Sequence, residues 1–193
     1  PYYEFARSHP ELFNLVEAGE VAVLYNEAFE KADTGNYTPS YLGILMLLAD
    51  SHRPFDVVFA GDPESRDGAD PLSTTDLSAY KAIILPNAQM LTDSQVSQLE
   101  SYISGGGTLI GLGQIANQDE NGNDVSSTRT LDDYFTSDGT STVGSGLAIC
   151  FTANLGDNYH GNSATNIGPS EYDWEVTAQN LIDTAYYRST WSS

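Results

Sequence analysis

Short apolar runs recur along the chain, and each is bounded by Gly, Pro or polar residues. Their β-branched content and their short length are typical of strands that are buried on both faces of a sheet. Such strands are predicted over residues 20–25, 55–60, 82–85, 108–112 and 147–152.

Segments with helical spacing of apolar residues lie between these runs. Thr38 is a favourable N-cap and Pro39 suits the first helical position, which together predict a helix over residues 39–51. Thr92 and Gln95 have the spacing of a capping box, and the helix that follows them ends at the glycine run 105–107. Further helices are predicted over residues 1–18, 131–135 and 174–185.

The alternation of strands and helices predicts an α/β fold. Right-handed βαβ crossovers would build a mainly parallel sheet of at least five strands with helices on both faces. Polar segments without periodicity predict surface loops over residues 61–75 and 113–127, and a long excursion over 154–170. We divide the chain into a lead-in helix from a preceding domain (1–18), the α/β domain (19–160) and an extension whose helix packs on that domain (161–193).

The chain is strongly acidic, with 27 acidic and 7 basic residues among 193 and a formal net charge of −20. A polyanion repels phosphate backbones and anionic lipids, so neither nucleic acid nor membrane is an expected partner. The longest apolar run, residues 42–49, is also far shorter than the ~20 residues that a membrane span needs. The even spread of acids indicates a solvated acidic coat, typical either of a cytoplasmic protein in a salt-loving organism or of a secreted protein.

No covalent nucleophile is predicted. The turn GLGQI resembles the frame of a nucleophile elbow, but Gln114 stands where Ser or Cys would be needed. Cys150 lies inside an apolar strand, where a buried and inert thiol is expected, and a single cysteine cannot form an intrachain disulfide. The histidines His9, His52 and His160 do not suggest a triad, and His52 suits the C-terminus of a helix.

Polar residues follow four of the predicted strands. Ligands of open parallel sheets bind beyond the carboxyl ends of the strands, where the strand order reverses. This rule gives a candidate crevice, although polar residues at strand ends are also what any surface loop requires. The crevice candidates are Asn26, Glu27, Asn87, Gln89, Gln114 and Asn154.

One loop carries the alternating oxygen ligands of a calcium site, at Asp119, Asn121 and Asn123. Asp124 stands where an EF-hand needs Gly and Thr130 where it needs Glu, which excludes an EF-hand. An irregular calcium site here is the alternative to a solvated turn. The same alternatives apply to a second acidic loop with Asp62, Glu64, Asp67 and Asp70. No cofactor is predicted.

Several segments together resemble a known family. The pieces VAVLYNEA, SHRPFDVVF, YKAIILPN, GGGTLI, DENGN and LDDYF, in this order, are similar to the trimerisation domain of family 42 glycoside hydrolases and of β-galactosidase-like proteins. The resemblance implies a flavodoxin-like three-layer sandwich of the class I glutamine-amidotransferase type, which follows a catalytic (β/α)8 barrel. It carries over no catalytic residue, because the family's two glutamates belong to that barrel.

The resemblance therefore implies a non-catalytic module of a larger carbohydrate-active protein. Its expected partners are further copies of itself, with a trimer as one form, and the catalytic barrel of a parent protein. A stand-alone small-molecule enzyme or binder of the amidotransferase-like fold, using Glu27, Asn87 and Gln114, remains the alternative. Direct carbohydrate binding by the aromatic residues Tyr186, Tyr187 and Trp191 is a further one.

Overall fold

A computed structural model describes residues 20–62, 64, 69–163 and 172–187, together with residues 4 and 8. The side chains of 34, 162–163 and 172–178 are not among the described ones. The predicted lead-in helix, with His9, lies almost entirely outside the described residues, as do Asp67 and Trp191. Among the described helices, none combines the length and the apolar character that a membrane-spanning helix needs.

The core of the molecule is a six-stranded sheet in the order β2-β1-β3-β4-β6-β5. Neighbouring strands are parallel except at one edge, where β5 runs antiparallel to β6. The strands are β1 (Val21–Asn26), β2 (Asp56–Ala60), β3 (Ala82–Pro86), β4 (Thr108–Leu112), β5 (Gly139–Val143) and β6 (Gly146–Phe151). The observed α/β architecture confirms the predicted fold class.

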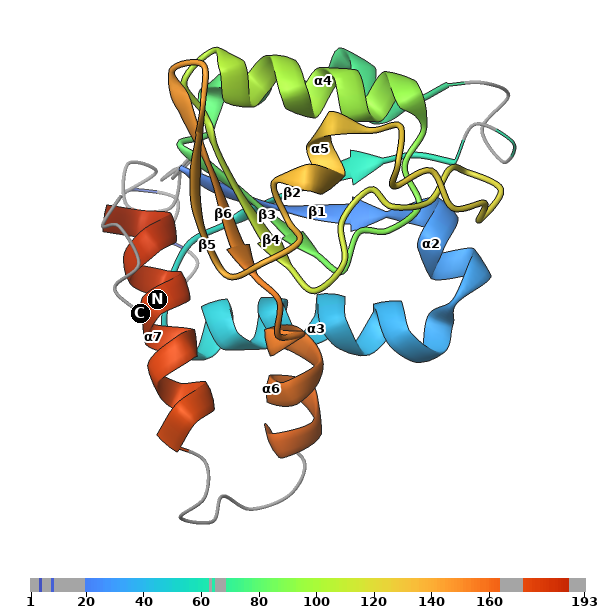
Figure 1. Ribbon diagram of the computed structural model, residues 1–193. Helices are drawn as coiled ribbons and strands as arrows, with labels where there is room; N and C mark the ends of the chain where they lie inside the picture. The colour runs from blue at the N-terminus through green and yellow to red at the C-terminus, as the bar shows by residue number, and fades with distance from the viewer. Residues whose placement is uncertain are drawn as a thin grey trace.

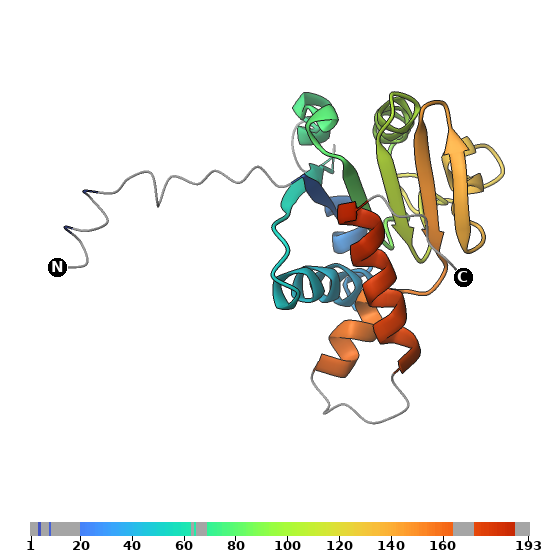
Figure 2. The ribbon, with the colours of Figure 1, turned by 90° about the vertical axis from the view of Figure 1, so that its left-hand side faces the viewer.

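Helices cover both faces of the sheet, as Figures 1 and 2 show. One face carries α4 (Asp93–Ser104), α5 (Thr130–Asp133) and the 3-10 turns η2 (Pro71–Thr74) and η3 (Leu77–Ala79). The other face carries α3 (Thr34–Asp50), α6 (Leu155–Ser163) and α7 (Tyr172–Tyr187), while α2 (Glu27–Ala32) follows β1 directly.

The two faces have separate hydrophobic cores because successive residues of a strand point to opposite sides. Along β1, Ala22 and Leu24 pack in the core beneath α4, whereas Val21 and Val23 pack in the core above α3. All four side chains are fully buried. Burial on both faces explains why β1 is a continuous apolar run rather than an alternating one.

The start of α3 corrects the prediction. The helix begins at Thr34, so Thr38 is not its N-cap and Pro39 lies inside it. An interior proline removes one helical hydrogen bond. The first turns of α3 are instead supported by a contact between Tyr37 and β1. The side chain of Tyr37 is fully buried, and its hydroxyl accepts a hydrogen bond from the backbone N–H of Asn26.

Other elements also differ from the prediction, among them α2, β5 and α6. The edge strand β5 was not predicted, because its sequence GTSTV has hydroxyl side chains and only one apolar residue. The segment expected to be an excursion contains α6, a mostly polar helix that packs against α3. The capping box of Thr92 and Gln95 is confirmed at the start of α4, and that helix ends at Gly105.

Candidate functional site

The strand order reverses between β1 and β3, so the carboxyl ends of these two strands define the candidate crevice. Asn26 lies at the end of β1, and only 1% of its surface is exposed. Its side-chain Nδ2 donates to the carbonyl of Met90 at 2.7 Å, and its Oδ1 accepts from the N–H of Phe29 at 3.1 Å. Asn26 therefore caps α2 and ties it to the loop that follows β3.

Three predicted crevice residues meet beyond β3 and β4. Asn87 Oδ1 accepts from the backbone N–H of Gln114 at 3.2 Å and from Nε2 of Gln89 at 3.1 Å. The backbone of Asn87 has a φ of 47°, and its N–H donates to the carbonyl of Leu112 at 2.7 Å. A Cβ at Gly113 would lie 3.0 Å from Asn87 Oδ1, so the close approach of the two loops favours glycine there.

Glu27 joins α2 to the loop after β2. Its Oε2 accepts from the backbone N–H of Asp62 at 3.0 Å, and its Oε1 lies 3.2 Å from Nζ of Lys31. Lys31 also lies 3.1 Å from Oδ2 of Asp62. Glu27 is thus paired with a cation and with a backbone donor, which disfavours a role as a general base.

The last crevice candidate lies elsewhere. Asn154 precedes α6, and its Nδ2 donates to Oγ of Ser40 at 2.6 Å. Ser40 in turn donates to the carbonyl of Asn36 at 2.6 Å. Asn154 therefore links α6 to α3 on the opposite face of the sheet from α4, and its side chain is not part of the group around Asn87.

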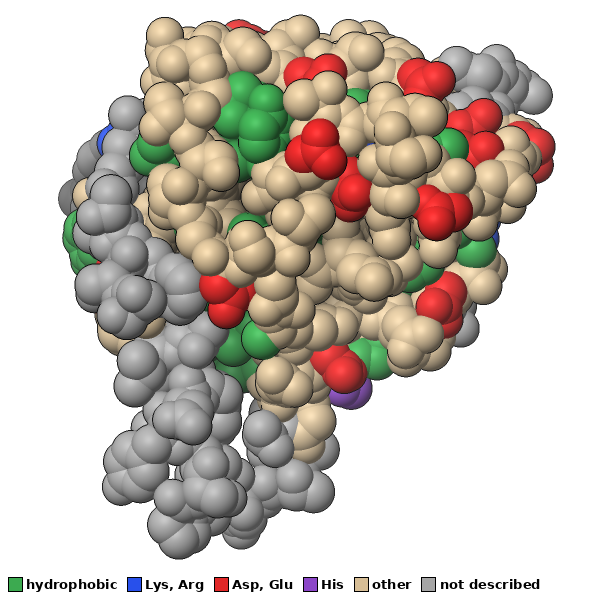
Figure 3. Space-filling model, in the orientation of Figure 1, with side chains coloured by type: hydrophobic (Ala, Val, Ile, Leu, Met, Phe, Trp, Pro, Cys, Tyr) green, Lys and Arg blue, Asp and Glu red, His purple; other side chains and the backbone are tan. Residues whose placement is uncertain are grey.

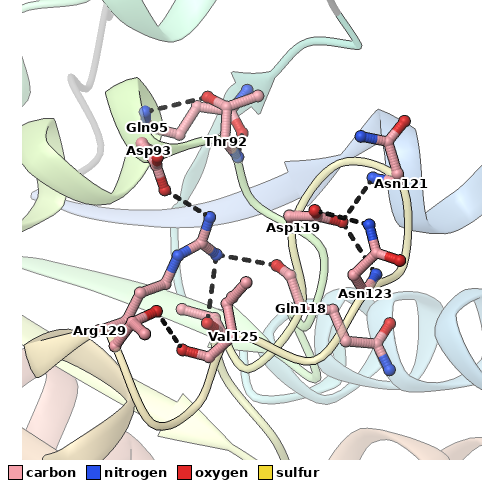
Figure 4. Close-up of polar contacts among 11 residues, drawn as sticks. Thr92, Asp93, Gln95, Gln118, Asp119, Asn121, Asn123, Val125 and Arg129 are labelled. Carbon is pink, nitrogen blue, oxygen red and sulfur yellow. Dashed lines mark hydrogen bonds and ion pairs between the residues drawn. The ribbon is translucent and has the colours of Figure 1, made fainter.

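The acidic loop that carries the calcium prediction is held by its own hydrogen bonds (Figure 4). Asp119 Oδ1 accepts from the backbone N–H groups of Asn121 and Asn123, at 2.9 and 2.8 Å, and Oδ2 accepts from Nδ2 of Asn123 at 2.8 Å. These hydrogen bonds, chiefly the one from the Asn123 side chain, lower the pKa of the Asp119 carboxyl. The alternating pattern is explained by a turn in which one carboxylate satisfies the backbone.

The second acidic loop is organised in a similar way. Asp70 Oδ1 accepts from the N–H groups of Gly61 and Leu72, and Asp62 Oδ1 accepts from the N–H of Glu64. Within the described residues, no three His, Cys, Asp or Glu side chains converge in a way that could hold a metal ion.

Arg129 is a central residue of this region that the sequence analysis did not single out. Its side chain is almost fully buried, and Nη1 donates to the carbonyls of Ala116 at 3.2 Å and Gln118 at 2.8 Å. Its Nη2 lies 2.8 Å from Oδ1 of Asp93 at the start of α4 (Figure 4). One feature of the sequence could have identified Arg129: it is a basic residue within a polar segment, in a chain that has only 7 basic residues.

The only thiol of the chain is buried in the core beneath α4. Burial, helped by the charge of Asp138, raises the pKa of Cys150 to about 11, so the thiol is protonated at neutral pH. His52 follows the end of α3 and His160 lies in α6, both in the layer across the sheet from this core. The described residues thus place no histidine beside Cys150.

Two of the hollows on the surface of the described residues bear on this question. One of about 410 Å³ adjoins the crevice and is lined by Gly113, Gln114, Asn117, Ser126, Asp132 and Thr152, among others. The other, of about 870 Å³, lies between η3 and α4, near the amino ends of the strands, and its lining is rich in serine. The larger hollow is therefore not at the edge of the sheet where α/β proteins bind ligands.

No family model and no curated protein matches this chain. Solved structures do match it. A catalytic mutant of Gan42B, a GH42 β-galactosidase from G. stearothermophilus, is 16% identical with a TM-score of 0.56, over 81% of this chain and 31% of that one. The β-galactosidase from Bacillus circulans sp. alkalophilus is 15% identical with a TM-score of 0.54, over 84% of this chain and 34% of that one.

A third match is the β-galactosidase from Rahnella sp. R3, which is 13% identical with a TM-score of 0.57, over 95% of this chain and 35% of that one. At these identities the likeness establishes a shared fold. The chain spans about a third of the length of the β-galactosidases that it matches. The resemblance noted from the sequence is therefore present in three dimensions, in one part of those enzymes.

Proposed function

We propose that this chain is a non-catalytic α/β module of a larger carbohydrate-active, β-galactosidase-like protein. In that protein it serves the association of subunits and shapes a neighbouring active site. The observation that carries the proposal is the extent of the match, which includes 81–95% of this chain but only 31–35% of the β-galactosidases.

The chemistry of the described residues supports a scaffold rather than an enzyme. Asn26, Asn87 and Glu27 are bound to backbone groups or to a neighbouring lysine, so they stabilise loops. Gln114 offers no nucleophilic atom, and the thiol of Cys150 is buried and protonated. Acyl transfer by this fold would need an activated nucleophile at the end of a strand.

The proposal is tested by measuring activity and mass on the same preparation. The chain is incubated with nitrophenyl galactoside, and its mass is followed by light scattering from low to high concentration. We expect no turnover and a mass that rises above that of the monomer. Turnover that survives repurification would overturn the scaffold role, and a strict monomer at the highest concentration would overturn the assembly role.

A small-molecule binder is the second candidate, and one observation favours it. Asn87, Gln89 and Gln114 meet beside the hollow of about 410 Å³, where an uncharged polar ligand would find amide groups. Glutamine and galactose are suitable probes in a thermal-shift titration, since a ligand that binds the native state must raise the melting temperature. A concentration-dependent rise that Gln114→Ala reduces would favour this candidate over the scaffold.

A further inference from the structure

The hollow of about 410 Å³ beside the crevice has a lining that is rich in oxygen atoms. It lies beyond the carboxyl ends of β4 and β6, next to residues of the segment 126–136. The polar side chains of its lining are those of Gln114, Asn117, Ser126, Asp132, Thr136 and Thr152. The kind of ligand that such a hollow can take depends on which of these groups still have a hydrogen or a lone pair to offer.

Two hydroxyl groups of the lining have their hydrogens engaged outside the hollow. Ser126 Oγ donates to Oδ1 of Asp124 at 2.7 Å, and Thr152 Oγ1 donates to Oδ1 of Asp138 at 2.7 Å. Neither of these two aspartates is among the lining residues. Because a hydroxyl has one hydrogen and two lone pairs, both hydroxyl oxygens can offer only lone pairs to a molecule in the hollow.

The carboxylate of Asp132 is the only charged group of the lining, and among the described residues it has no hydrogen-bond or ion-pair partner. Burial, helped by the charges of Asp133 and Asp124, raises the pKa of the Asp132 carboxyl. The charged form of Asp132 is therefore less stable here than it would be in water. A cation beside this carboxylate would stabilise it.

A second acceptor of the lining also lacks a partner. Oδ1 of Asn117 is buried, and no donor of the described residues forms a hydrogen bond with it. A buried acceptor without a hydrogen bond costs free energy, which a donor that enters the hollow can offset. The hydroxyl of Thr136 donates to the carbonyl of Asp133 at 3.4 Å. Side-chain hydrogens are therefore available only from the amides of Gln114 and Asn117, and acceptors prevail in the lining.

The surroundings of the hollow favour a cationic ligand. Acidic side chains are spread over the face seen in Figure 3, and the chain has a formal net charge of −20, so positively charged ligands are attracted to it. A metal ion does not fit, because the described residues contain no group of three His, Cys, Asp or Glu side chains that could hold one. An ammonium group does fit, since it carries a positive charge and three donors and has no acceptor.

We propose that this hollow binds a small organic molecule through an ammonium group. The carboxylate of Asp132 is its counter-ion, and the oxygens of Ser126 and Thr152 are further acceptors. The inference rests on the small-molecule candidate given above and deepens it, because the amides around Asn87 and Gln114 take the neutral part of the same ligand. It does not depend on the role in subunit association.

The test uses galactosamine, which has an ammonium group, with galactose and N-acetylgalactosamine as neutral controls. Binding is followed by NMR chemical-shift titration of the isotope-labelled chain, in a slightly acidic buffer of fixed ionic strength that keeps the amine protonated. The titration gives the dissociation constant and the residues that the ligand reaches. Two variants remove the same charge: Asp132→Asn within the lining and Asp133→Asn at an exposed position outside it. Thermal melting confirms that both are folded.

We expect galactosamine to bind at least about tenfold more tightly than either control, with shifts at residues 113–117 and 126–136. Asp132→Asn should weaken this binding at least about tenfold, and Asp133→Asn by less than about threefold. Equal affinity for the three sugars would overturn the inference and leave a neutral ligand as the candidate. Equal losses in the two variants would also overturn it, because net charge would then be the cause. The absence of shifts with every sugar would overturn the small-molecule candidate as well, whereas the assembly role is decided separately by mass.

Discussion

The crevice at the strand ends and the outer side of α3 use their side chains in opposite ways. At the crevice, Asn26 and Asn87 are nearly buried, and their amide groups bind backbone atoms of neighbouring loops. On α3, Leu42 and Met46 remain over a third exposed. The part of an α/β fold where chemistry is usually found stabilises the structure here, whereas exposed apolar side chains lie on the outer side of α3. Substitutions in the two regions should therefore affect different properties.

The largest effect on stability is expected at Asn26. Asn26→Ala removes the cap of α2 and leaves the buried carbonyl of Met90 without its donor. Together these losses should lower the free energy of unfolding by about 2–4 kcal/mol. Urea denaturation followed by circular dichroism measures the change. Gln114→Ala is the matched control, because this side chain is exposed, and it should change stability by less than about 0.5 kcal/mol.

A somewhat smaller loss is expected at Arg129. Arg129→Met keeps the length of the side chain but leaves the carbonyls of Ala116 and Gln118 without the guanidinium, which should cost about 2–3 kcal/mol. Asp93→Asn removes only the charge of the ion pair, and the side chain of Asp93 is 94% exposed, so less than about 1 kcal/mol is expected. Equal losses in both variants would show that the ion pair, rather than the buried carbonyl contacts, anchors this loop.

At Asn87, a pair of substitutions separates backbone strain from the side-chain contact. Asn87→Gly removes the hydrogen bonds to Gln114 and Gln89 but tolerates the φ of 47°, and should cost about 1 kcal/mol. Asn87→Ala loses the same bonds and also places a Cβ in the left-handed region, which should add about 1 kcal/mol. If the two variants are equally stable in urea, backbone conformation is not part of the role of Asn87.

The buried thiol of Cys150 should make the free energy of unfolding fall as pH rises. Acid unfolding has the opposite sign, because stability is then lost as pH falls. Burial raises the pKa of Cys150 from its ordinary 9.0 to about 11 in the native state, so the native state holds this proton more tightly than the unfolded state does. The stabilising contribution is complete below pH 9 and is lost as pH rises to about 11. The midpoint of urea unfolding should fall over this range, and less so in Cys150→Ala. An identical fall in both proteins would assign the effect to other groups, such as Tyr186, whose pKa burial raises to about 12.

Buried strands were easier to predict from the sequence than the edge of the sheet or the start of α3. The apolar runs of β1, β3 and β4 identify these strands, because burial on both faces leaves polar residues only at the strand ends, as at Asn26 and Thr108. The strand β5 has the exposed pattern of a sheet edge, and its Thr and Ser residues resemble a loop. The start of α3 was mispredicted because Pro39 resembles a first helical residue, whereas the buried contact of Tyr37 extends the helix before it.

For the candidate site, position was easier to predict than role. The rule of strand ends identified Asn87, Gln89 and Gln114, and these three residues do meet in space. Whether an amide group is satisfied by the protein or available to a ligand depends on which loop backbone comes within about 3 Å, a tertiary contact that no local pattern encodes. Arg129 was missed for the same reason. Its partners Gln118, Ala116 and Asp93 lie 11, 13 and 36 residues away along the chain.

The most direct test of the account is the mass of the wild-type chain as a function of concentration in low salt and in molar KCl. Salt screens the repulsion between chains of net charge −20, while apolar contacts between copies are not weakened by it. We predict that sedimentation equilibrium gives a mass above that of the monomer, and that molar KCl lowers the concentration at which it appears. Monomers at all concentrations in both buffers would contradict the account, as would an association that molar KCl abolishes.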